Sequence, residues 1–201
     1  MYIEIGNITF YISFSFAVFL AVAANTSVGR TYLLSLICAF LHEGVHVFFL
    51  KKCGCRKILL KFSFGGIKMQ TDGFSLLSYK NTVLCTVSAP IVNIITGALF
   101  YCLFFLFRKE VFYIFAVINL ITGAVNLLPL PFLDGGRTLA ALLAVKYEEH
   151  EIRKICDILA VTSLVFLGGV FAVTLFMKKY VLFLMFFFFY CTLGYINDKL
   201  T

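Results

Sequence analysis

The sequence predicts an all-α polytopic membrane protein with about six transmembrane helices and a re-entrant β-hairpin between the second and the third. Three observations support this prediction. The chain of 201 residues is 62% hydrophobic and only 13% charged, with a mean hydropathy of +1.00. Its apolar runs are long and almost free of charge, as membrane spans are. One stretch of period-two alternation around a Gly-Gly pair interrupts these runs. We expect one integral membrane domain over residues 1–201.

Charge and cysteine content exclude two other classes of protein. The net charge is +7, but the basic residues lie between the apolar runs, where they set topology, so we expect no nucleic-acid partner. Seven cysteines are an odd number, and most lie in or next to apolar runs, which predicts no disulfide framework. Cys53-Gly54-Cys55 lacks the second cysteine pair that a soft-metal site would need.

The first expected span is Ile8 to Ala24. A cleaved signal peptide is the alternative, because Ala21-Val22-Ala23 resembles a cleavage site. The residues before the apolar run include Glu4 but no Lys or Arg, which favours an uncleaved anchor.

The second span, Leu33 to Leu50, carries the most informative residues of the chain, His42, Glu43 and His46. Ionisable side chains are costly in hydrocarbon and indicate a functional site. Histidines four residues apart share one face of a helix, so His42 and His46 can bind one metal ion. Glu43 would lie beside that metal, where it can take a proton from water. A haem ligand set, a proton relay and a transport site are the alternatives for two histidines on a membrane helix.

A β-hairpin is expected after the basic segment 51–61. Polar and apolar residues alternate in 61–64 and again in 67–70, and Gly65-Gly66 lies between the two runs. This pattern is typical of a hairpin, with an irregular loop as the alternative. At membrane depth, such a hairpin is tolerated only where protein or a water-filled cavity covers its backbone.

The third and fourth spans, Thr82 to Phe107 and Val111 to Leu128, each carry a polar motif. The third contains SAPIVN (88–93), whose Asn93 is either functional or a packing hydrogen bond between helices. The fourth ends in NLLPLPFLDGGR (126–137). Two prolines one residue apart break a helix.

Gly135-Gly136 adds conformational freedom just after Asp134. We expect Asp134 at the end of an unwound span, with a simple helix end and a solvated carboxylate as the alternative. The segment Lys146 to Asp157 predicts a short surface helix with a solvated His150. Ile158 to Met177 and Tyr180 to Ile196 are the fifth and sixth spans.

The distribution of basic residues predicts the topology. Six spans put 12 Lys and Arg residues on the side of the termini and five on the other side. The positive-inside rule then places the termini and both large connectors in the cytoplasm of a multi-pass cell-membrane protein. The His42–His46 segment and Asp134 both lie at cytoplasmic ends of spans, so they are expected at similar depth.

Asp134 is the best candidate for a third metal ligand. An extended zinc motif would need Gly and His at 49 and 52, where Phe49 and Lys52 stand. No Glu lies between Glu43 and Glu110, which excludes a nearby helical Glu. Only Asp134 follows an unwound span that would bring it into the membrane. The other acidic candidates are Asp72, Asp157 and the Glu148–Glu151 cluster.

The motifs HEGVH, SAPIVN and NLLPLPFLDGGR, in this order on three successive spans, resemble the site-2 protease family of intramembrane zinc metalloproteases. The resemblance covers roughly residues 30–145. It implies that His42, His46 and Asp134 bind one Zn²⁺ per chain and that Glu43 is the catalytic acid and base. Gly65 and Gly66 match the hairpin of the family. Asn93 and Asn126 match family asparagines that contact substrate or shape the site.

The same resemblance implies a transmembrane protein substrate, the lipid bilayer and a membrane regulator as partners. Ala89 stands where many family members have Gly. We expect neither a PDZ insertion nor a C-terminal nucleotide-sensing domain. The layout is closest to the bacterial sporulation-factor-processing subgroup without its regulatory tail. One alternative is a catalytically inactive membrane binding protein of this fold. The other is a metal-ion transporter, which would need more polar residues in its last two spans.

Overall fold

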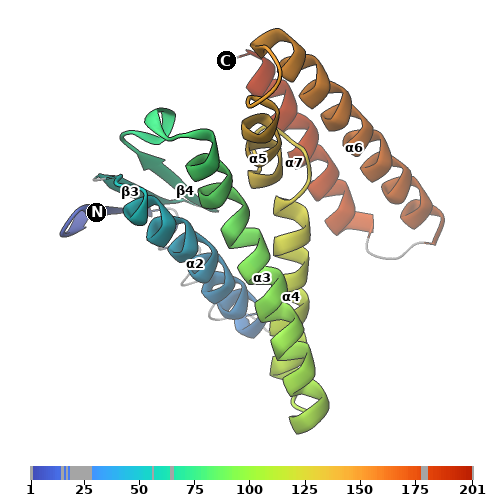
Figure 1. Ribbon diagram of the computed structural model, residues 1–201. Coiled ribbons are helices and arrows are strands. Elements are labelled where there is room, and N and C mark those ends of the chain that lie inside the picture. The colour runs from blue at the N-terminus through green and yellow to red at the C-terminus, as the bar shows by residue number, and fades with distance from the viewer. Residues whose placement is uncertain are drawn as a thin grey trace. The chain divides into compact units, whose positions relative to one another are not determined.

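The computed structural model describes residues 2–14, 16, 18, 29–55, 57–63, 66–177 and 181–200. The chain folds as two compact units, Met1–Ala124 and Val125–Thr201. The described residues form six helices and a four-stranded sheet, whose main elements are labelled in Figure 1. The expectation of a mostly helical protein is therefore confirmed, but an all-α class is wrong because the first unit contains a sheet.

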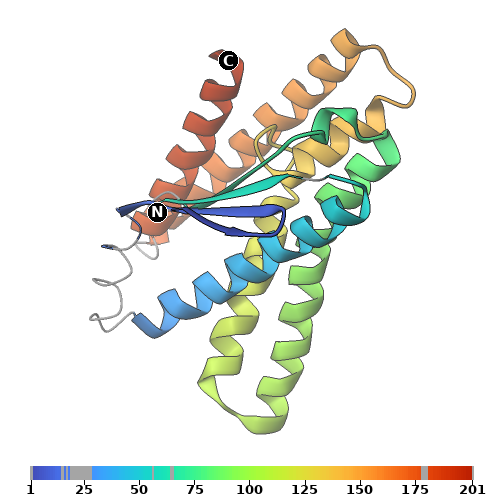
Figure 2. The same cartoon turned by 90° about the vertical axis from the view of Figure 1, so that its left-hand side faces the viewer.

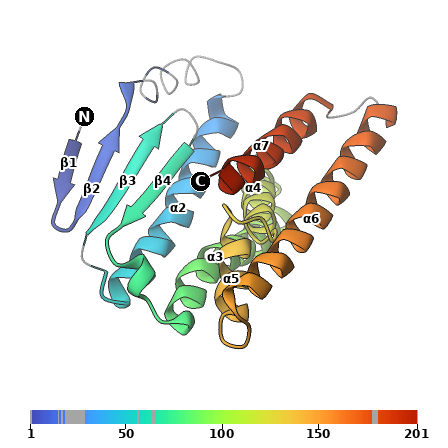
Figure 3. The ribbon, with the colours of Figure 1, turned by 90° about the horizontal axis from the view of Figure 1, so that it is seen from above.

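The sheet of the first unit has the strand order β1-β2-β3-β4 (Figure 3). Its strands are β1 (Tyr2–Ile5), β2 (Ile8–Ile12), β3 (Ile58–Ser63) and β4 (Gly66–Thr71). The pairs β1–β2 and β3–β4 are antiparallel, and β2–β3 is parallel. A parallel pair needs a long crossover connection, and the helix α2 (Gly29–Lys52) lies within the one between β2 and β3.

The hairpin β1–β2 corrects the expected first span. Residues 8–12 form a strand rather than the start of a transmembrane helix. All five are β-branched or aromatic, which suits a strand as well as a membrane. The two-residue turn Gly6-Asn7 precedes them, with Gly6 at φ +60°, and such a turn closes a hairpin. Of the rest of the expected span, residues 15, 17 and 19–24 lie outside the described residues.

The expected hairpin after the basic segment is confirmed as β3–β4, but the Gly-Gly pair is not its loop, because Gly66 lies opposite Ser63 as the first residue of β4. Phe64 and Gly65 of its turn lie outside the described residues. Because β2 pairs with the other side of β3, β4 is the edge strand of this hairpin, and β1 is the opposite edge of the described sheet. Ile58 N–H donates to Asn7 at 3.1 Å, and the Phe62 carbonyl accepts from Ser13 at 3.0 Å, so the even-numbered residues of β3 bond towards β2.

The pairing also determines which backbone groups of β4 face outwards. The backbone N–H and C=O groups of the odd-numbered residues of β3 form hydrogen bonds with β4. Their partners in β4 are Gly66, Lys68 and Gln70, whose backbone groups therefore point towards β3. The N–H and C=O groups of Ile67 and Met69 therefore point to the free edge of the sheet.

Helix α2 covers one face of the sheet (Figures 2 and 3). Leu50 of α2 packs in one apolar cluster with Ile58, Leu60 and Phe62 of β3, and the rings of Phe40 and Phe62 lie 5.3 Å apart. The residues that alternate with them on the strands include Thr9, Tyr11, Lys61 and Gln70. The sheet is therefore amphipathic, with an apolar face on α2 and a more polar opposite face.

Helices α3 (Tyr79–Phe107) and α4 (Glu110–Asn126) complete the first unit. Two glycines allow them to approach closely. A Cβ on Gly97 would lie 2.7 Å from Leu120, and one on Gly123 would lie 2.8 Å from the Pro90 carbonyl oxygen. Small residues at such contacts are typical of helices packed in membranes.

The second unit contains the end of α4 and the helices α5 (Asp134–Leu143), α6 (Glu149–Met177) and α7 (Val181–Leu200). The mixed-charge segment was expected to form a separate surface helix. Instead, its residues from Glu149 onward are the first turns of α6, because no helix-breaking residue separates them from the apolar run. Leu130 and Leu133 pack against Ala160 of α6 and Cys191 of α7.

Among the described residues, three helices are long and apolar enough to cross a membrane. They are Gly29–Lys52, Tyr79–Phe107 and Glu149–Leu175, while Glu110–Asn126 is a shorter apolar helix. Many large apolar side chains on these helices are exposed, as a lipid environment requires. The protein is therefore a multi-pass membrane protein.

Candidate metal centre

The histidines of α2 lie on one buried stripe of that helix. Cys38, His42, His46 and Leu50 follow one another at four-residue spacing, and all four are buried. Residues at this spacing are neighbours on a helix surface. The Nε2 atoms of His42 and His46 lie 3.3 Å apart, as the His-Glu-x-x-His pattern predicts.

Hydrogen bonds on the far side of each ring determine which nitrogen carries the proton. His46 Nδ1 lies 2.7 Å from the carbonyl oxygen of Cys85, and a carbonyl can only accept. His42 Nδ1 lies 3.4 Å from Asn93 Oδ1, which is also an acceptor. Both rings therefore donate through Nδ1, and in the neutral rings that bind metals each Nε2 atom keeps a lone pair.

Two lone pairs 3.3 Å apart repel each other unless a cation lies between them. A tetrahedral zinc ion with Zn–N bonds of about 2.05 Å holds two nitrogens about 3.3–3.4 Å apart. The observed separation thus fits zinc without movement of either ring.

Asp134 is the first residue of α5, and its side chain is buried. The ligand atoms offered by His42, His46 and Asp134 all lie within 4.8 Å of one another. Two histidines and one carboxylate are a known ligand set of catalytic zinc, which keeps a fourth position open.

The loop before α5 is built to hold Asp134. Helix α4 ends at Asn126, and the two prolines of residues 127–133 prevent its continuation. Within the loop, Leu133 N–H donates to the Leu130 carbonyl at 2.9 Å. The sequence predicted an unwound segment followed by Asp134, and this is confirmed.

The two glycines after Asp134 have a different role from the one expected. Neither has a positive φ, so conformational freedom is not what they supply. A Cβ on Gly135 would lie 2.3 Å from the Leu127 carbonyl oxygen, and one on Gly136 would lie 2.1 Å from that of Leu130. The glycines are needed because the loop backbone packs directly on the first turn of α5.

The other predicted site residues are distributed as follows. Glu43 follows His42 on α2 and is half-buried. Asn93 of α3 is brought to His42, whereas Asn126 is the last residue of α4. Gly66 begins β4, and Gly65 lies outside the described residues.

Two buried residues, Cys38 on the histidine stripe of α2 and its partner Asn119, were missed by sequence reasoning. Cys38 Sγ accepts from Asn93 Nδ2 at 3.3 Å and lies 3.4 Å from Oδ1 of Asn119 in α4. Cys38 lies four residues before His42, and Asn119 is an isolated polar residue in an apolar helix. Both signals were available, but neither predicts which residues on other helices they meet.

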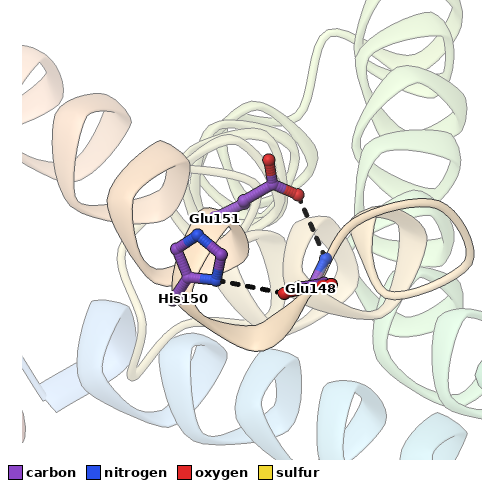
Figure 4. Close-up of polar contacts among 3 residues, drawn as sticks. All are labelled: Glu148, His150 and Glu151. Atoms are coloured by element: carbon purple, nitrogen blue, oxygen red, sulfur yellow. Dashed lines mark hydrogen bonds and ion pairs between the residues drawn. The ribbon is translucent and has the colours of Figure 1, made fainter.

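The third histidine is not part of this centre. His150 is exposed at the start of α6, and its Nδ1 lies 3.5 Å from Glu148 Oε2 (Figure 4). Glu151 accepts from the backbone N–H of Glu148 at 3.2 Å, so it caps the helix. The expectation of a solvated His150 agrees with this arrangement.

Comparisons with known proteins point to one family. Residues 106–170 match the model of peptidase family M50. The chain is 27% identical to a zinc metalloprotease of Methanocaldococcus jannaschii over 158 residues, which cover 72% of this chain and 45% of that protein. The chain thus spans about half the length of this curated relative.

A solved site-2 protease from Methanocaldococcus jannaschii has the same fold, with a TM-score of 0.63 and 23% sequence identity. The similarity covers 99% of this chain and 93% of that one. The chain is therefore similar to peptidase family M50 in sequence over residues 106–170, and to a site-2 protease in fold.

Proposed function

We propose that this chain is an intramembrane zinc metalloprotease that hydrolyses a peptide bond in or near a transmembrane segment of a membrane-tethered protein. The observation that carries the proposal is the pair of converging Nε2 lone pairs, 3.3 Å apart, with the Asp134 carboxylate beside them. Such a ligand set suits a metal cation, and the relative that the chain matches is named a zinc metalloprotease.

His42, His46 and Asp134 would hold one Zn²⁺ per chain. Zinc at such a centre supplies Lewis-acid chemistry, because it makes water nucleophilic near neutral pH and polarises a carbonyl. Glu43 accepts the proton of the attacking water and returns it to the leaving nitrogen of the scissile bond. Removal of the Glu43 carboxylate should therefore stop the chemistry without emptying the metal centre.

The substrate segment must unwind, because the hydrogen bonds of a helix shield its peptide bonds. The free edge of β4 offers the backbone groups of Ile67 and Met69 to an extended segment, which would bind by strand addition. Helix-breaking residues in the substrate would lower the cost of unwinding. Asn126, Gly65 and Gly66 are further substrate contacts in this proposal.

Lys and Arg are more frequent in the segments on the side of the termini than in those on the other side. This excess supports a cytoplasmic location for the termini and the active-site side. Residues 1–201 would act as one protease domain. Its partners would be a transmembrane protein substrate, the bilayer and a membrane regulator. We also propose the layout of the sporulation-factor-processing subgroup, which the ordered motifs and short connectors support.

The test compares the wild-type chain with Glu43→Gln in liposomes that contain reporter proteins with one transmembrane segment and helix-breaking residues. Cleavage by the wild type and its loss in Glu43→Gln, with equal zinc content, would support the protease. Wild-type binding of the reporters without cleavage would instead favour the inactive binding protein. Zinc transport into the liposomes, unchanged in Glu43→Gln, would favour the transporter.

A further inference from the structure

We infer that Asn93, Cys38 and Asn119 form a buried hydrogen-bonded chain that positions His42 for metal binding. Asn93 is then a positioning residue rather than a substrate contact. The inference rests on the proposed metal centre. It adds that the orientation of one zinc ligand depends on side chains from three helices.

The chain of contacts runs from α2 through α3 and back to α2, and then to α4. His42 Nδ1 donates to Asn93 Oδ1 at 3.4 Å, and Asn93 Nδ2 donates to Cys38 Sγ at 3.3 Å. Cys38 Sγ lies 3.4 Å from Asn119 Oδ1 and 3.6 Å from Thr122 Oγ1. Each contact joins residues far apart in the sequence, so the whole chain depends on the packing of the three helices.

The contact between Asn119 and Cys38 determines which group donates and which accepts in each of the other hydrogen bonds. Asn119 Nδ2 donates to the carbonyl of Phe115 at 2.9 Å, which turns Asn119 Oδ1 towards Cys38 as an acceptor. The Cys38 thiol then donates to Asn119 and accepts from the Asn93 amide. Asn93 must therefore present its oxygen to His42, and the His42 ring must carry its proton on Nδ1. This leaves the Nε2 lone pair for the metal.

Burial strengthens the hydrogen bonds that orient His42. Cys38, Asn93 and Asn119 are each 1% exposed, and His42 is 6% exposed. Water does not compete for these groups, and hydrogen bonds are stronger in such surroundings. Both polar ends of the Asn93 amide already have protein partners, which speaks against a direct contact with substrate.

The two histidines differ in a way that the test can use. His46 is oriented by a backbone carbonyl, which no substitution of a side chain removes. His42 is oriented by side chains, so its orientation can be changed by mutation. Loss of a hydrogen-bond partner to a metal-binding histidine weakens metal affinity by about 10–100-fold.

The experiment measures zinc affinity of the detergent-purified full chain by competition with a chelator. Asn93→Leu should bind zinc about 10–100-fold more weakly, whereas Asn93→Asp keeps the acceptor and should bind within about threefold of wild type. Cys38→Ala should weaken binding, and Cys38→Ser, which keeps a donor and an acceptor, should restore it. Cys191→Ala is the matched control, a buried free thiol outside this chain of contacts, and should not change zinc affinity.

Thermal unfolding of the zinc-free variants separates positioning from loss of fold, and the Cys38 pair gives a second test if Asn93→Leu does not fold. Visible absorption of the Co²⁺-loaded forms should change in Asn93→Leu and Cys38→Ala but not in Cys191→Ala. A folded Asn93→Leu with wild-type zinc affinity and a raised KM would overturn the inference, because it would make Asn93 a substrate contact. Zinc binding without any cleavage would refute the proposed protease and leave the positioning intact.

Discussion

The contact between the proline loop and α5 predicts a large effect from one added methyl group. In Gly136→Ala the new Cβ would lie 2.1 Å from the carbonyl oxygen and 2.5 Å from the carbonyl carbon of Leu130. Both atoms belong to the backbone, so no side-chain rotation relieves the clash. The loop must move by about 1 Å, and overpacking of this kind costs about 1–3 kcal/mol.

This displacement acts directly on the metal centre. Asp134 lies two residues before Gly136 in the same helical turn, and good metal sites tolerate changes in ligand distance of only about 0.2 Å. Gly136→Ala should therefore bind zinc at least about tenfold more weakly than the wild type. The Tm in detergent should fall as well.

Gly44→Ala is the matched control. Gly44 lies in α2 between the two histidines, and a Cβ there would meet nothing within 4 Å. Alanine is a better helix former than glycine by about 0.5–1 kcal/mol, so Gly44→Ala should keep its zinc affinity and gain slightly in Tm. Chelator competition and thermal unfolding measure both variants. Wild-type affinity and Tm in Gly136→Ala would refute the reasoning about the loop.

The remaining predictions concern the edge strand and the last helix. Ile67→Pro removes an outward N–H of β4 and should impair cleavage of reporter substrates at normal zinc content; unchanged cleavage would remove strand addition from the mechanism. Lys68→Pro, which breaks the ladder with β3, should instead lower the Tm. Gly194→Val places its first new carbon 2.7 Å from the Phe132 ring and should lower the Tm by a few degrees, whereas Gly169→Val, with open space, should not; equal Tm values would show that the ring moves aside freely.

The parts of the site that depend on local spacing were predictable from the sequence. The four-residue spacing of His42 and His46 determines a shared helix face, and the prolines before Asp134 determine where α4 ends. The hairpin β3–β4 follows from period-two alternation around Gly-Gly. In each case the residues within about one turn or one hairpin contain the whole signal.

The features of the fold and the site that depend on packing between distant segments could not be predicted from local residue spacing. An apolar β-strand and the start of a membrane span share the same composition, so residues 8–12 were assigned to a helix although Gly6-Asn7 indicated a turn. The contact of Cys38 with Asn119 joins residues 81 positions apart. The role of Gly136 becomes visible only when the loop lies on α5.

The central claim is that His42, His46 and Asp134 bind one zinc ion. The most direct measurement is the metal content of the detergent-purified wild type beside Asp134→Ala, with Glu43→Gln as the control that keeps all three ligands. We predict about one zinc per chain in the wild type and in Glu43→Gln, and a loss or strong reduction in Asp134→Ala. Equal zinc in Asp134→Ala would mean that the third ligand is another residue, and no zinc in the wild type after reconstitution would contradict the metal centre itself.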